Sequence, residues 1–275
     1  MPELPEVETI VRCLRPRLAG REIRKVRVFF RPIVRRPGAA GLGPLQGRTV
    51  LGVGRRGKMI VVRLSGGMSL LFHLKMTGQL FCCAAGAPRD KHTHLAISFR
   101  DSRGELRFRD IRKFGFALAV PAAEDGSVPE LSRLGPEPLS LGFEEFRSAF
   151  AGRRGRIKAR LLDQEIIAGI GNIYADEILF EAGIHPEADV SRLSGAAWRR
   201  LWSAVRAVLR RAIRHRGTTL RDYRDGDGEP GGFQARLRVY GREGLACRRC
   251  GAPVRRRRVA GRSSHFCPRC QRKRG

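Results

Sequence analysis

The end of the chain contains four cysteines whose spacing is typical of a metal site. Cys247 and Cys250 form one CxxC pair, and Cys267 and Cys270 form a second pair after sixteen intervening residues. Two such pairs supply four thiolates for a tetrahedral Zn²⁺ ion and close a small ribbon that has too few apolar residues to fold by burial alone. Because cysteine fills all four coordination positions, the sequence predicts one structural zinc that does not activate water.

The predicted zinc finger is also strongly basic. Residues 247–275 include eleven Lys or Arg residues and no Asp or Glu. A run of exposed charge needs no partner, but charge held on a rigid ribbon favours contact with the phosphates of a nucleic acid. We expect His265 to lie at the surface rather than on the zinc, and Cys13, Cys82 and Cys83 to be ordinary buried or half-buried thiols.

A second set of candidate reagents stands at the start of the chain, "MPELPEVETI". Pro5 and the acids after it predict a helix start, since proline suits the first helical position and acids complement the helix dipole. The apolar residues that follow have the spacing of one buried helix face: Val7, Ile10, Val11, Leu14 and Leu18. Pro2 and Glu3, directly before this helix, are either a stiff cap or the reagents of a reaction. Their types alone do not decide between the two.

The charge of the chain narrows the class of partner. Among 275 residues, Lys and Arg number 55 against 26 Asp and Glu, which gives a formal net charge of +29. This charge favours a polyanion such as nucleic acid, although a membrane surface or an acidic protein could also satisfy it. No apolar run approaches the roughly 20 residues of a membrane span, and the acidic N-terminus lacks the features of a signal peptide. We therefore expect a cytoplasmic protein, in which cysteines serve as metal ligands rather than in disulfides.

The elements that must position these residues fall into two halves. Between residues 49 and 120, strand-like runs alternate with turn residues, as in "HLAISFRDSRGELRFRD", and predict an antiparallel β-sandwich against which the first helix packs. Residues 123–142 lose this periodicity and gather Pro and Gly, which indicates a domain boundary. The predicted domains are a β-sandwich at 1–133, a linker at 134–142, a helical domain at 143–235 and the zinc finger at 236–275.

The second half has helical periodicity. The segment "SGAAWRRLWSAVRAVLRRAIRHRG", with Ser194 as its cap, predicts a helix whose apolar face packs in the core rather than one that reads DNA. Further upstream, "AGIGN" separates two helical patterns, and Asn172 stands where the second helix begins. A glycine-rich helix start is either a plain turn or a phosphate site made by backbone N–H groups and the helix dipole. The residues leave both interpretations open.

Several motifs, in order along nearly the whole chain, resemble the formamidopyrimidine-DNA glycosylase family of bacterial base-excision repair enzymes. They are "PELPEVE", "RRGK", "HLKMTG", "KHTH", "DIRKFG", "IKARLLDQEIIAGIGNIYADE", "GTTLRDY", "VYGREG" and the four-cysteine finger. The resemblance implies an α+β enzyme in which DNA runs between an N-terminal antiparallel β-sandwich flanked by helices and a C-terminal helix-two-turns-helix domain with a zinc finger. Such an enzyme removes oxidised purines, such as 8-oxoguanine and formamidopyrimidines, from damaged double-stranded DNA and cuts the strand at the abasic site. We expect a monomer of the bacterial cytoplasm, associated with the nucleoid.

The same resemblance assigns the catalytic roles. After removal of Met1, Pro2 carries the free amine that attacks the sugar C1′, and a secondary amine gives an imine with a permanent positive charge. Glu3 acts as acid or base on the sugar ring; otherwise it only caps the helix. Lys58 assists β-elimination; otherwise it is a surface charge after a turn. Arg262 occupies the position of the δ-elimination donor, but an arginine guanidinium stays protonated in proteins, so we expect it to clamp a phosphate.

Two further groups follow from the resemblance. Met76, Arg112 and Phe114 would fill the gap left when the damaged nucleotide leaves the stack, although Met76 and Phe114 also fit core packing in their strand-like surroundings. The residues matched to the family's grip on the DNA backbone are His73, His92, Arg112, Arg154, Lys158, Asn172 and Tyr240. His92 and His94 could also suggest a metal pair, but no further ligand accompanies them.

The loop "RDYRDGDGEPGGFQ" matches the segment that closes over the everted base, and its glycines and acids predict mobility. Arg216 precedes Gly217 where relatives often have a second glycine or small residue, and the run Arg255–Arg258 is expected to add nonspecific DNA affinity.

Two alternative functions remain. One is the sister endonuclease VIII group, which acts on oxidised pyrimidines and typically has glycine in place of Leu4. The other is a noncatalytic zinc-ribbon protein that binds nucleic acid.

Overall fold

The structure is a computed structural model that describes residues 1–35, 42–122 and 128–273. The chain divides into two compact units. The first is made of Met1–Ser132 and His215–Gly232, and the second of Arg133–Arg214 and Phe233–Gly275. The segment His215–Gly232 therefore packs with the N-terminal half, although it follows a long helix of the other unit in sequence. The domain ranges given above stay a prediction.

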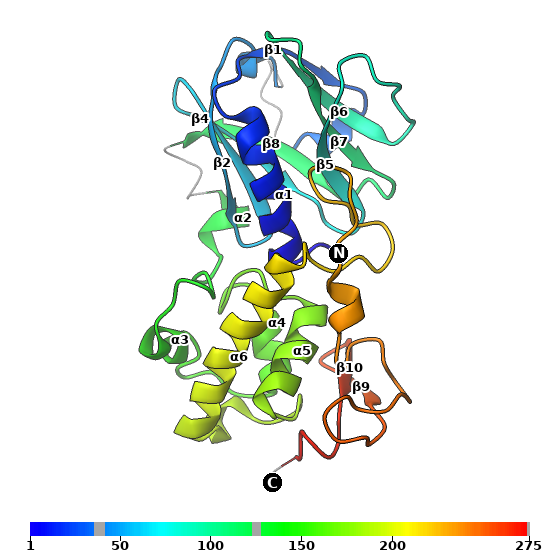
Figure 1. Cartoon of the computed structure of the whole chain (residues 1–275). Helices are drawn as coiled ribbons and strands as arrows, with labels where there is room; N and C mark the ends of the chain where they lie inside the picture. The colour runs from blue at the N-terminus through cyan, green and yellow to red at the C-terminus, as the bar shows by residue number, and fades with distance from the viewer. Residues whose placement is uncertain (36–41, 123–127, 274–275) are drawn as a thin grey trace. The chain divides into compact units, whose positions relative to one another are not determined.

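Helix α1 (Leu4–Leu18) opens the first unit, one residue earlier than the sequence predicts (Figure 1). Glu3 is its N-cap and Pro5 lies in its first turn, where the missing N–H of proline costs no helical hydrogen bond. All five residues of the predicted apolar face are buried. Each contributes about 1.5–3 kcal/mol by leaving water, which explains why this amphipathic helix forms against the sheets.

The strands described in the first unit form two four-stranded antiparallel sheets, which confirms the antiparallel sandwich that the sequence predicts (Figure 1). In order across the first sheet, the strands are β1 (Ile23–Val28), β6 (Thr93–Phe99), β7 (Glu105–Asp110) and β5 (Gly78–Cys83). The second sheet contains β2 (Val50–Arg56), β3 (Met59–Leu64), β4 (Met68–His73) and β8 (Phe116–Pro121). The short helices η1 (Arg31–Ile33), η2 (Gly43–Leu45) and α2 (Pro129–Ser132) complete the unit. Sequence reasoning missed β1, because "IRKVRV" is rich in charge and leaves most of its side chains at least partly exposed.

One apolar core joins helix α1 to both sheets. Its buried side chains include Val7 and Leu14 from α1, Phe72 from β4 and Phe108 from β7. The rings of Phe72 and Phe108 meet edge to face with their centroids 5.5 Å apart, which is a favourable geometry for two aromatic quadrupoles. Because β4 and β7 belong to different sheets, this contact closes the sandwich.

The second unit is mainly helical. Its elements are α3 (Phe143–Ala149), α4 (Ile157–Leu162), α5 (Asn172–Ala182), η4 (Val190–Arg192), α6 (Gly195–Arg214), η5 (Phe233–Arg236), β9 (Arg255–Val259) and β10 (Arg262–Phe266). Helix α6 begins as predicted after Ser194, whose hydroxyl accepts a hydrogen bond from the N–H of Ala197 at 3.3 Å. Trp198, Leu201 and Leu209 on its predicted apolar face are buried, so α6 is a core helix. Within the described ranges, no helix is both long and apolar enough to cross a bilayer.

Candidate active site and metal centre

The first turn of α1 holds the two candidate reagents of the N-terminus. Pro2 and Glu3 are buried, whereas Met1 ahead of them is 48% exposed. The backbone N–H of Glu3 donates a hydrogen bond to Glu6 Oε2 at 2.8 Å. This bond belongs to a capping box, which fixes the direction in which the chain enters the helix. The segment around Pro2 is therefore held in place rather than frayed.

Glu6 also ties this segment to a distant part of the chain. Its Oε1 accepts a hydrogen bond from the N–H of Thr218 at 2.7 Å, and the Tyr223 hydroxyl donates to the Glu6 carbonyl oxygen at 3.3 Å. Gly217 permits this approach, since a Cβ there would lie 2.7 Å from Glu6 Oε1 and its φ is +77°. Sequence reasoning missed Glu6, because only a fold that returns residue 218 to α1 reveals its role.

Lys58 lies at the turn of the hairpin formed by β2 and β3. Gly57, with a φ of +55°, and Lys58 are the two residues of this turn. Arg55 attaches the turn to α1, because its guanidinium donates to the Gly57 carbonyl oxygen at 2.9 Å and to the Glu8 carboxylate at 3.2 Å. The Lys58 side chain is buried. The candidate lysine is thus carried by a hairpin that is bonded to the same helix as the N-terminal reagents.

Met76, Arg112 and Phe114 lie on two turns of the sandwich, one between β4 and β5 and the other between β7 and β8. Met76 and Phe114 are 43% and 52% exposed, so neither packs in the core. The Arg112 guanidinium lies 4.6 Å from the centroid of the Phe114 ring, within the range of a cation–π interaction. All three side chains are therefore exposed to solvent, which is a requirement for filling a gap in the DNA stack.

Asp110 holds these two turns together. Its buried carboxylate accepts hydrogen bonds from the Thr77 hydroxyl at 2.5 Å, the Arg112 N–H at 3.2 Å and the Gly115 N–H at 2.7 Å. A charged acceptor strengthens each of these bonds, so Asp110 fixes the backbone of both turns. Sequence reasoning missed this residue, whose signal is weak: an acid at the end of the strand-like run "ELRFRD".

His73 ends β4 near the hairpin of Lys58. Its Nδ1 accepts a hydrogen bond from the N–H of Lys75 at 2.9 Å. Burial, together with the positive charges of Lys75, Lys58 and Arg35, lowers the pKa of His73 to about 3. The neutral ring then carries its proton on Nε2, which is the atom that can donate to a phosphate.

The structure describes both His92 and His94, the two residues that could suggest a metal pair. His94 is buried, and its Nε2 lies 2.8 Å from the carbonyl oxygen of Asp110. In the part of the chain that the structure describes, no cluster of candidate metal ligands includes either histidine. His92 is half-buried, and its carbonyl oxygen accepts the N–H of Asp110 at 2.9 Å.

In the second unit, Lys158 is buried in a network of charged groups. Its Nζ forms an ion pair with Asp176 Oδ1 at 2.7 Å and donates to the Ser263 carbonyl oxygen at 2.6 Å. Asp176 Oδ2 accepts the backbone N–H of His265 at 2.8 Å, and His265 is buried rather than at the surface as expected. The network connects α4 and α5 to β10, next to Arg262. A direct contact between Lys158 and a DNA phosphate would require this ion pair to open.

The other candidate DNA-binding residues of this unit lie at the ends of elements. Arg262 begins β10 and is exposed, directly after the hairpin turn of Ala260 and Gly261. These two residues have φ values of +47° and +76°, which is typical of a two-residue hairpin turn. Arg154 is exposed ahead of α4, and Asn172 begins α5 as the sequence predicts.

Glu177 fixes the segment that leads into the finger. Its carboxylate accepts the N–H groups of Arg238, Val239 and Tyr240 at 2.9 to 3.0 Å. Burial raises the pKa of Glu177, and these three donors oppose the shift. The Tyr240 ring meets His265 edge to face, with centroids 5.1 Å apart. Sequence reasoning missed Glu177, whose only signal is an acid within the apolar stretch "YADEILF".

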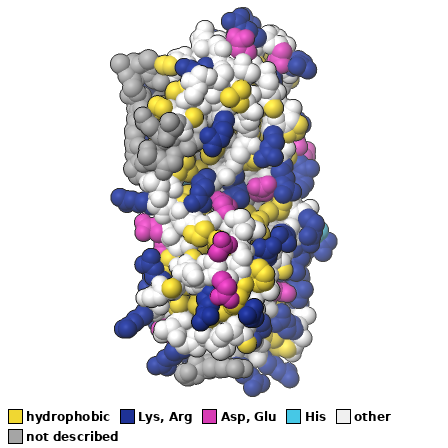
Figure 2. Space-filling model, turned by 90° about the vertical axis from the view of Figure 1, so that its left-hand side faces the viewer, with side chains coloured by type: hydrophobic (Ala, Val, Ile, Leu, Met, Phe, Trp, Pro, Cys, Tyr) yellow, Lys and Arg dark blue, Asp and Glu magenta, His cyan; other side chains and the backbone are white. Residues whose placement is uncertain are grey.

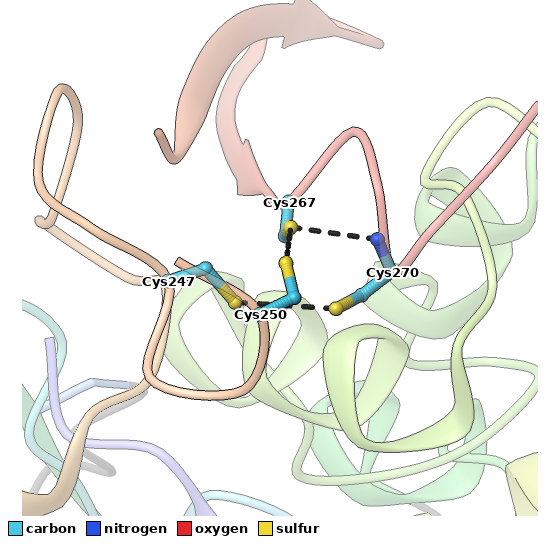
Figure 3. Close-up of side chains that lie close together, drawn as sticks. All are labelled: Cys247, Cys250, Cys267 and Cys270. Carbon is cyan, nitrogen blue, oxygen red and sulfur yellow. Dashed lines mark hydrogen bonds between the residues drawn. The ribbon is translucent and has the colours of Figure 1, made fainter. Parts of the chain in front are cut away.

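The four predicted zinc ligands converge (Figure 3). Cys247 and Cys250 come from one loop, and Cys267 and Cys270 follow β10. The Sγ atoms of Cys250 and Cys267 are 3.4 Å apart, and those of Cys247 and Cys270 are 4.0 Å apart. A tetrahedral zinc with Zn–S bonds of about 2.3 Å places its sulfurs about 3.8 Å apart, so the cluster has the size of a zinc site.

The chemistry of this cluster also fits a metal. Burial raises the pKa of Cys270 to about 12, whereas the backbone N–H of Ala252 lowers that of Cys250 to about 7. Four sulfurs at these distances are stable together as thiolates only around a shared cation. The apolar core beside them is small and consists of Phe180, Val239, Cys247, Val254 and Cys267. One structural zinc with four thiolate ligands is therefore what holds the finger.

Basic side chains outnumber acidic ones in this chain, with 55 Lys and Arg against 26 Asp and Glu. On the face shown in Figure 2, Lys and Arg side chains are spread over the described surface and exceed Asp and Glu. All four arginines of Arg255–Arg258 on β9 are exposed. Basic side chains spread over a surface in this way attract a long polyanion at many of its charged groups rather than at one.

The first unit is a β-sandwich with a buried N-terminal Pro-Glu segment, and the second is a helical unit with a closed four-cysteine centre. These features define a class of zinc-finger protein that carries an excess of basic side chains. Three family models match the chain. They are the formamidopyrimidine-DNA glycosylase N-terminal domain at residues 1–117, the formamidopyrimidine-DNA glycosylase H2TH domain at 134–224, and the zinc finger found in FPG and IleRS at 244–272. The chain belongs to the formamidopyrimidine-DNA glycosylase family.

Individual relatives agree with this assignment. The formamidopyrimidine-DNA glycosylase of Desulforamulus reducens is 46% identical over 98% of this chain and 99% of its own length. That of Symbiobacterium thermophilum is 47% identical over 98% of this chain and 89% of its own length. Among solved structures, the MutM (Fpg) protein from Thermus thermophilus matches with a TM-score of 0.88 and 44% identity, covering both chains completely. A Lactococcus lactis FPG mutant in complex with Fapy-dG-containing DNA matches with a TM-score of 0.91 and 36% identity over 99% of this chain and all of that chain.

Proposed function

We propose that this chain is a bifunctional DNA glycosylase and abasic-site lyase of base-excision repair that acts on oxidised purines. The observation that carries the proposal is the Pro2–Glu3 segment, held at the start of α1 and attached through that helix to the hairpin of Lys58. A noncatalytic zinc-ribbon protein would need the finger and the basic surface but not this segment. Solved relatives from Lactococcus lactis are complexes with Fapy-dG-containing and abasic-site-containing DNA, which supports the same substrate class.

The chemistry follows from proline at the free N-terminus. Once Met1 is removed, the Pro2 nitrogen attacks the sugar C1′, the glycosidic bond breaks, and the base leaves with the bonding electron pair and takes up a proton. The Pro2 nitrogen then gives up its N–H proton, the C1′–O4′ bond breaks and O4′ takes up a proton, so that the ring opens and a C1′=N⁺ imine forms. Because the amine is secondary, this imine is positively charged at every pH. This cation withdraws electrons, so the C2′ proton becomes acidic and the 3′ phosphate leaves by β-elimination. The 5′ phosphate leaves in the δ-elimination that follows.

The other candidate residues serve these steps. We assign Glu3 to proton transfer at the sugar ring and Lys58 to proton transfer or phosphate contact during β-elimination. The Glu6 carboxylate positions Glu3 by accepting its N–H at 2.8 Å. Arg262, exposed at the tip of the finger hairpin, clamps a phosphate, since its guanidinium is a permanent cation with several donors.

The damaged nucleotide must leave the helix before C1′ can be attacked. We assign the gap-filling role to Met76, Arg112 and Phe114, because these side chains are exposed on turns that Asp110 holds. A thioether and a phenyl ring replace lost base stacking, and a guanidinium can hydrogen-bond to the unpaired base opposite.

The remaining residues grip the DNA backbone. We assign direct phosphate contacts to His73, His92, Arg154, Asn172 and Tyr240. For Lys158 we propose an indirect role, because its ammonium is buried against Asp176 and Ser263 and supports the hairpin of Arg262. We further propose that the protein acts as a monomer in the bacterial cytoplasm, close to the nucleoid.

The test is covalent trapping on DNA. The purified protein, with removal of Met1 verified by mass spectrometry, is incubated with borohydride and a duplex that contains 8-oxoguanine opposite cytosine. We expect a covalent adduct located on Pro2, together with strand cutting in the absence of borohydride. Pro2→Ala should bind the duplex but neither trap nor cut it. The matched control Pro5→Ala, which changes a proline of the same turn without touching the terminal amine, should still do both.

The other outcomes identify the alternatives. Adducts formed mainly on oxidised pyrimidines would assign the chain to the specificity of the endonuclease VIII group. A Lactococcus lactis relative has been solved with an oxidised pyrimidine in DNA, so this arm is a necessary comparison. Binding without any adduct on any lesion would leave a noncatalytic DNA-binding protein, and an adduct on a residue other than Pro2 would refute the mechanism.

A further inference from the structure

Arg216 has an unusual backbone conformation for an arginine. It follows α6 and stands directly before Gly217, and its φ is +60°, in the left-handed region. Residues with a Cβ are strained there, and glycine is the residue that adopts this conformation without strain. An arginine at such a position indicates that its side chain makes contacts that offset the strain.

Those contacts are with two aspartates of the loop that follows. The Arg216 Nε lies 2.7 Å from Asp225 Oδ2, and its Nη2 lies 2.5 Å from the same oxygen and 3.2 Å from Asp227 Oδ2. The Asp225 side chain is fully buried, and its Oδ1 accepts the N–H groups of Asp227 at 2.9 Å and Glu229 at 3.1 Å. We call Arg216, Asp225 and Asp227 the Arg216 latch. A buried carboxylate with this many donors organises the loop around itself, and Arg216 supplies the charge that balances it.

The latch fastens the loop to the rest of the first unit. The Gly226 carbonyl oxygen accepts the N–H of Cys82 on β5 at 3.2 Å, and the Asp222 carbonyl oxygen accepts a hydrogen bond from the Gln79 side chain at 2.5 Å. From α1, Arg17 forms an ion pair with Asp227 at 2.5 Å. The loop between Thr218 and Gly232 is thus bonded to both a strand and a helix through the residues that surround the latch.

The same place could be taken for a metal site. Cys13, Asp225 and Asp227 offer three ligand atoms that all lie within 4.8 Å of one another. The Arg216 guanidinium, however, already contacts all three groups, with its Nη2 3.8 Å from Cys13 Sγ. Burial and the neighbouring aspartates raise the pKa of Cys13 to about 11, so its thiol stays protonated and is a poor ligand. The cation that this cluster holds is the arginine itself.

We propose that Arg216 is a positioning residue that holds the loop Thr218–Gly232 in the conformation needed for base excision. The inference rests on the proposed function and on the family resemblance, which matches residues 221–234 to the segment that closes over the everted base. Thr218, at the start of the loop, donates its N–H to the Glu6 carboxylate, which also accepts the N–H of Glu3. The Glu6 side chain therefore connects the loop directly to the N-terminal reagents. A glycine at position 216 would adopt the same backbone without offering any side chain to the aspartates. The arginine therefore gives this chain a more ordered loop than glycine would.

Hydrogen exchange of the free protein tests the latch without DNA. The variant Arg216→Asn removes the guanidinium but keeps a residue that tolerates a positive φ. Arg224→Asn is the matched control, an exposed arginine of the same loop. We expect the amides of Asp227 and Glu229 to exchange at least tenfold faster in Arg216→Asn and within twofold of the wild type in Arg224→Asn. Arg216→Lys, which keeps the charge but not the forked donors, should give an intermediate rate. Equal exchange in the wild type and Arg216→Asn would overturn the latch.

Single-turnover kinetics then test the positioning role. We expect Arg216→Asn to excise 8-oxoguanine at least fivefold more slowly than the wild type, with partial recovery in Arg216→Lys. It should cut a duplex that already contains an abasic site within twofold of the wild-type rate, because no base remains to be positioned. Unchanged excision in spite of faster loop exchange would refute the positioning role. Failure of the wild type itself to cut either duplex would instead refute the proposed function, and the exchange data would still decide the latch.

Discussion

Replacing Asp110 by asparagine should loosen the two turns that carry Met76, Arg112 and Phe114. The carboxylate accepts three hydrogen bonds, two on Oδ1 and one on Oδ2. An asparagine keeps the shape but has only one acceptor oxygen. If that oxygen faces the Thr77 hydroxyl and the Arg112 N–H, the new NH₂ group points at the Gly115 N–H, and two donors then oppose each other.

The size of the effect follows from this geometry. One buried N–H left without an acceptor costs about 1–3 kcal/mol, and each of the two remaining bonds loses about 1 kcal/mol when its acceptor becomes neutral. The sum is about 3 kcal/mol, taking the lower part of the first range. Since about 1.4 kcal/mol corresponds to a factor of ten, the Arg112 and Gly115 amides should exchange with solvent more than a hundredfold faster.

The measurement is native-state hydrogen exchange of these two amides in the wild type and in Asp110→Asn. Glu22→Gln serves as the control, because it makes the same acid-to-amide change in a surface ion pair with Arg100, whose two side chains are 37% and 68% exposed. Exposed pairs of this kind contribute about 0.2–1 kcal/mol, so the control should change exchange less than tenfold. Exchange of the Arg112 and Gly115 amides within threefold of the wild type in Asp110→Asn would show that Asp110 does not hold the turns.

Three further predictions concern the loop, the histidine and the metal. Gly217→Ala should lower the free energy of unfolding by about 3 kcal/mol, because a left-handed alanine costs about 1–2 kcal/mol and the new Cβ displaces the buried Glu6 carboxylate. The control is Gly228→Ala, where φ is +85° and no atom lies near the added Cβ. In the same denaturation experiment it should show only the backbone cost. Because burial and nearby cations lower the pKa of His73 to about 3 from an ordinary value of 6.5, the unfolded chain takes up a proton between these values that the folded chain does not. The free energy of unfolding should therefore fall as pH falls through that window, by at most about 1.4 kcal/mol per pH unit. In urea melts at a series of pH values, His73→Gln should make the free energy of unfolding depend less steeply on pH, and an unchanged dependence would contradict the shift. Chelation or Cys250→Ser should reduce bound zinc from one per chain to nearly none and weaken DNA binding at least tenfold, measured by metal analysis and fluorescence anisotropy, whereas Cys83→Ser should do neither.

Local sequence determined most of the fold. The spacing of Val7, Ile10 and Leu14 predicted the buried face of α1, and the alternation on either side of "DSRG" predicted the pairing of β6 with β7. The CxxC spacing predicted the cysteine cluster that the structure forms. These features could be predicted from the sequence because helical periodicity, strand alternation and the spacing within a CxxC pair are set by residues within a few positions of one another.

The candidate site was predicted only in part. The motifs named Pro2, Glu3 and Lys58, and the structure adds the bonds that hold them, through Glu6 and Arg55. Their catalytic roles remain predictions that the trapping experiment tests. For Met76 and Phe114 the sequence left core packing open beside exposure, because a turn and a strand of similar composition differ only in what packs against them.

The sequence by itself determined which residues are available for chemistry, which faces of the first helix and of α6 are apolar, and that four cysteines share a metal. Only the tertiary structure decided that Lys158 and Asp176 are buried together, that Asp110 joins two turns, and that Arg216 and Thr218 return to α1. The physical reason is that a charged side chain can be buried only where partners satisfy it. Thr218 and Glu6 are 212 positions apart, so no local pattern indicates that partnership.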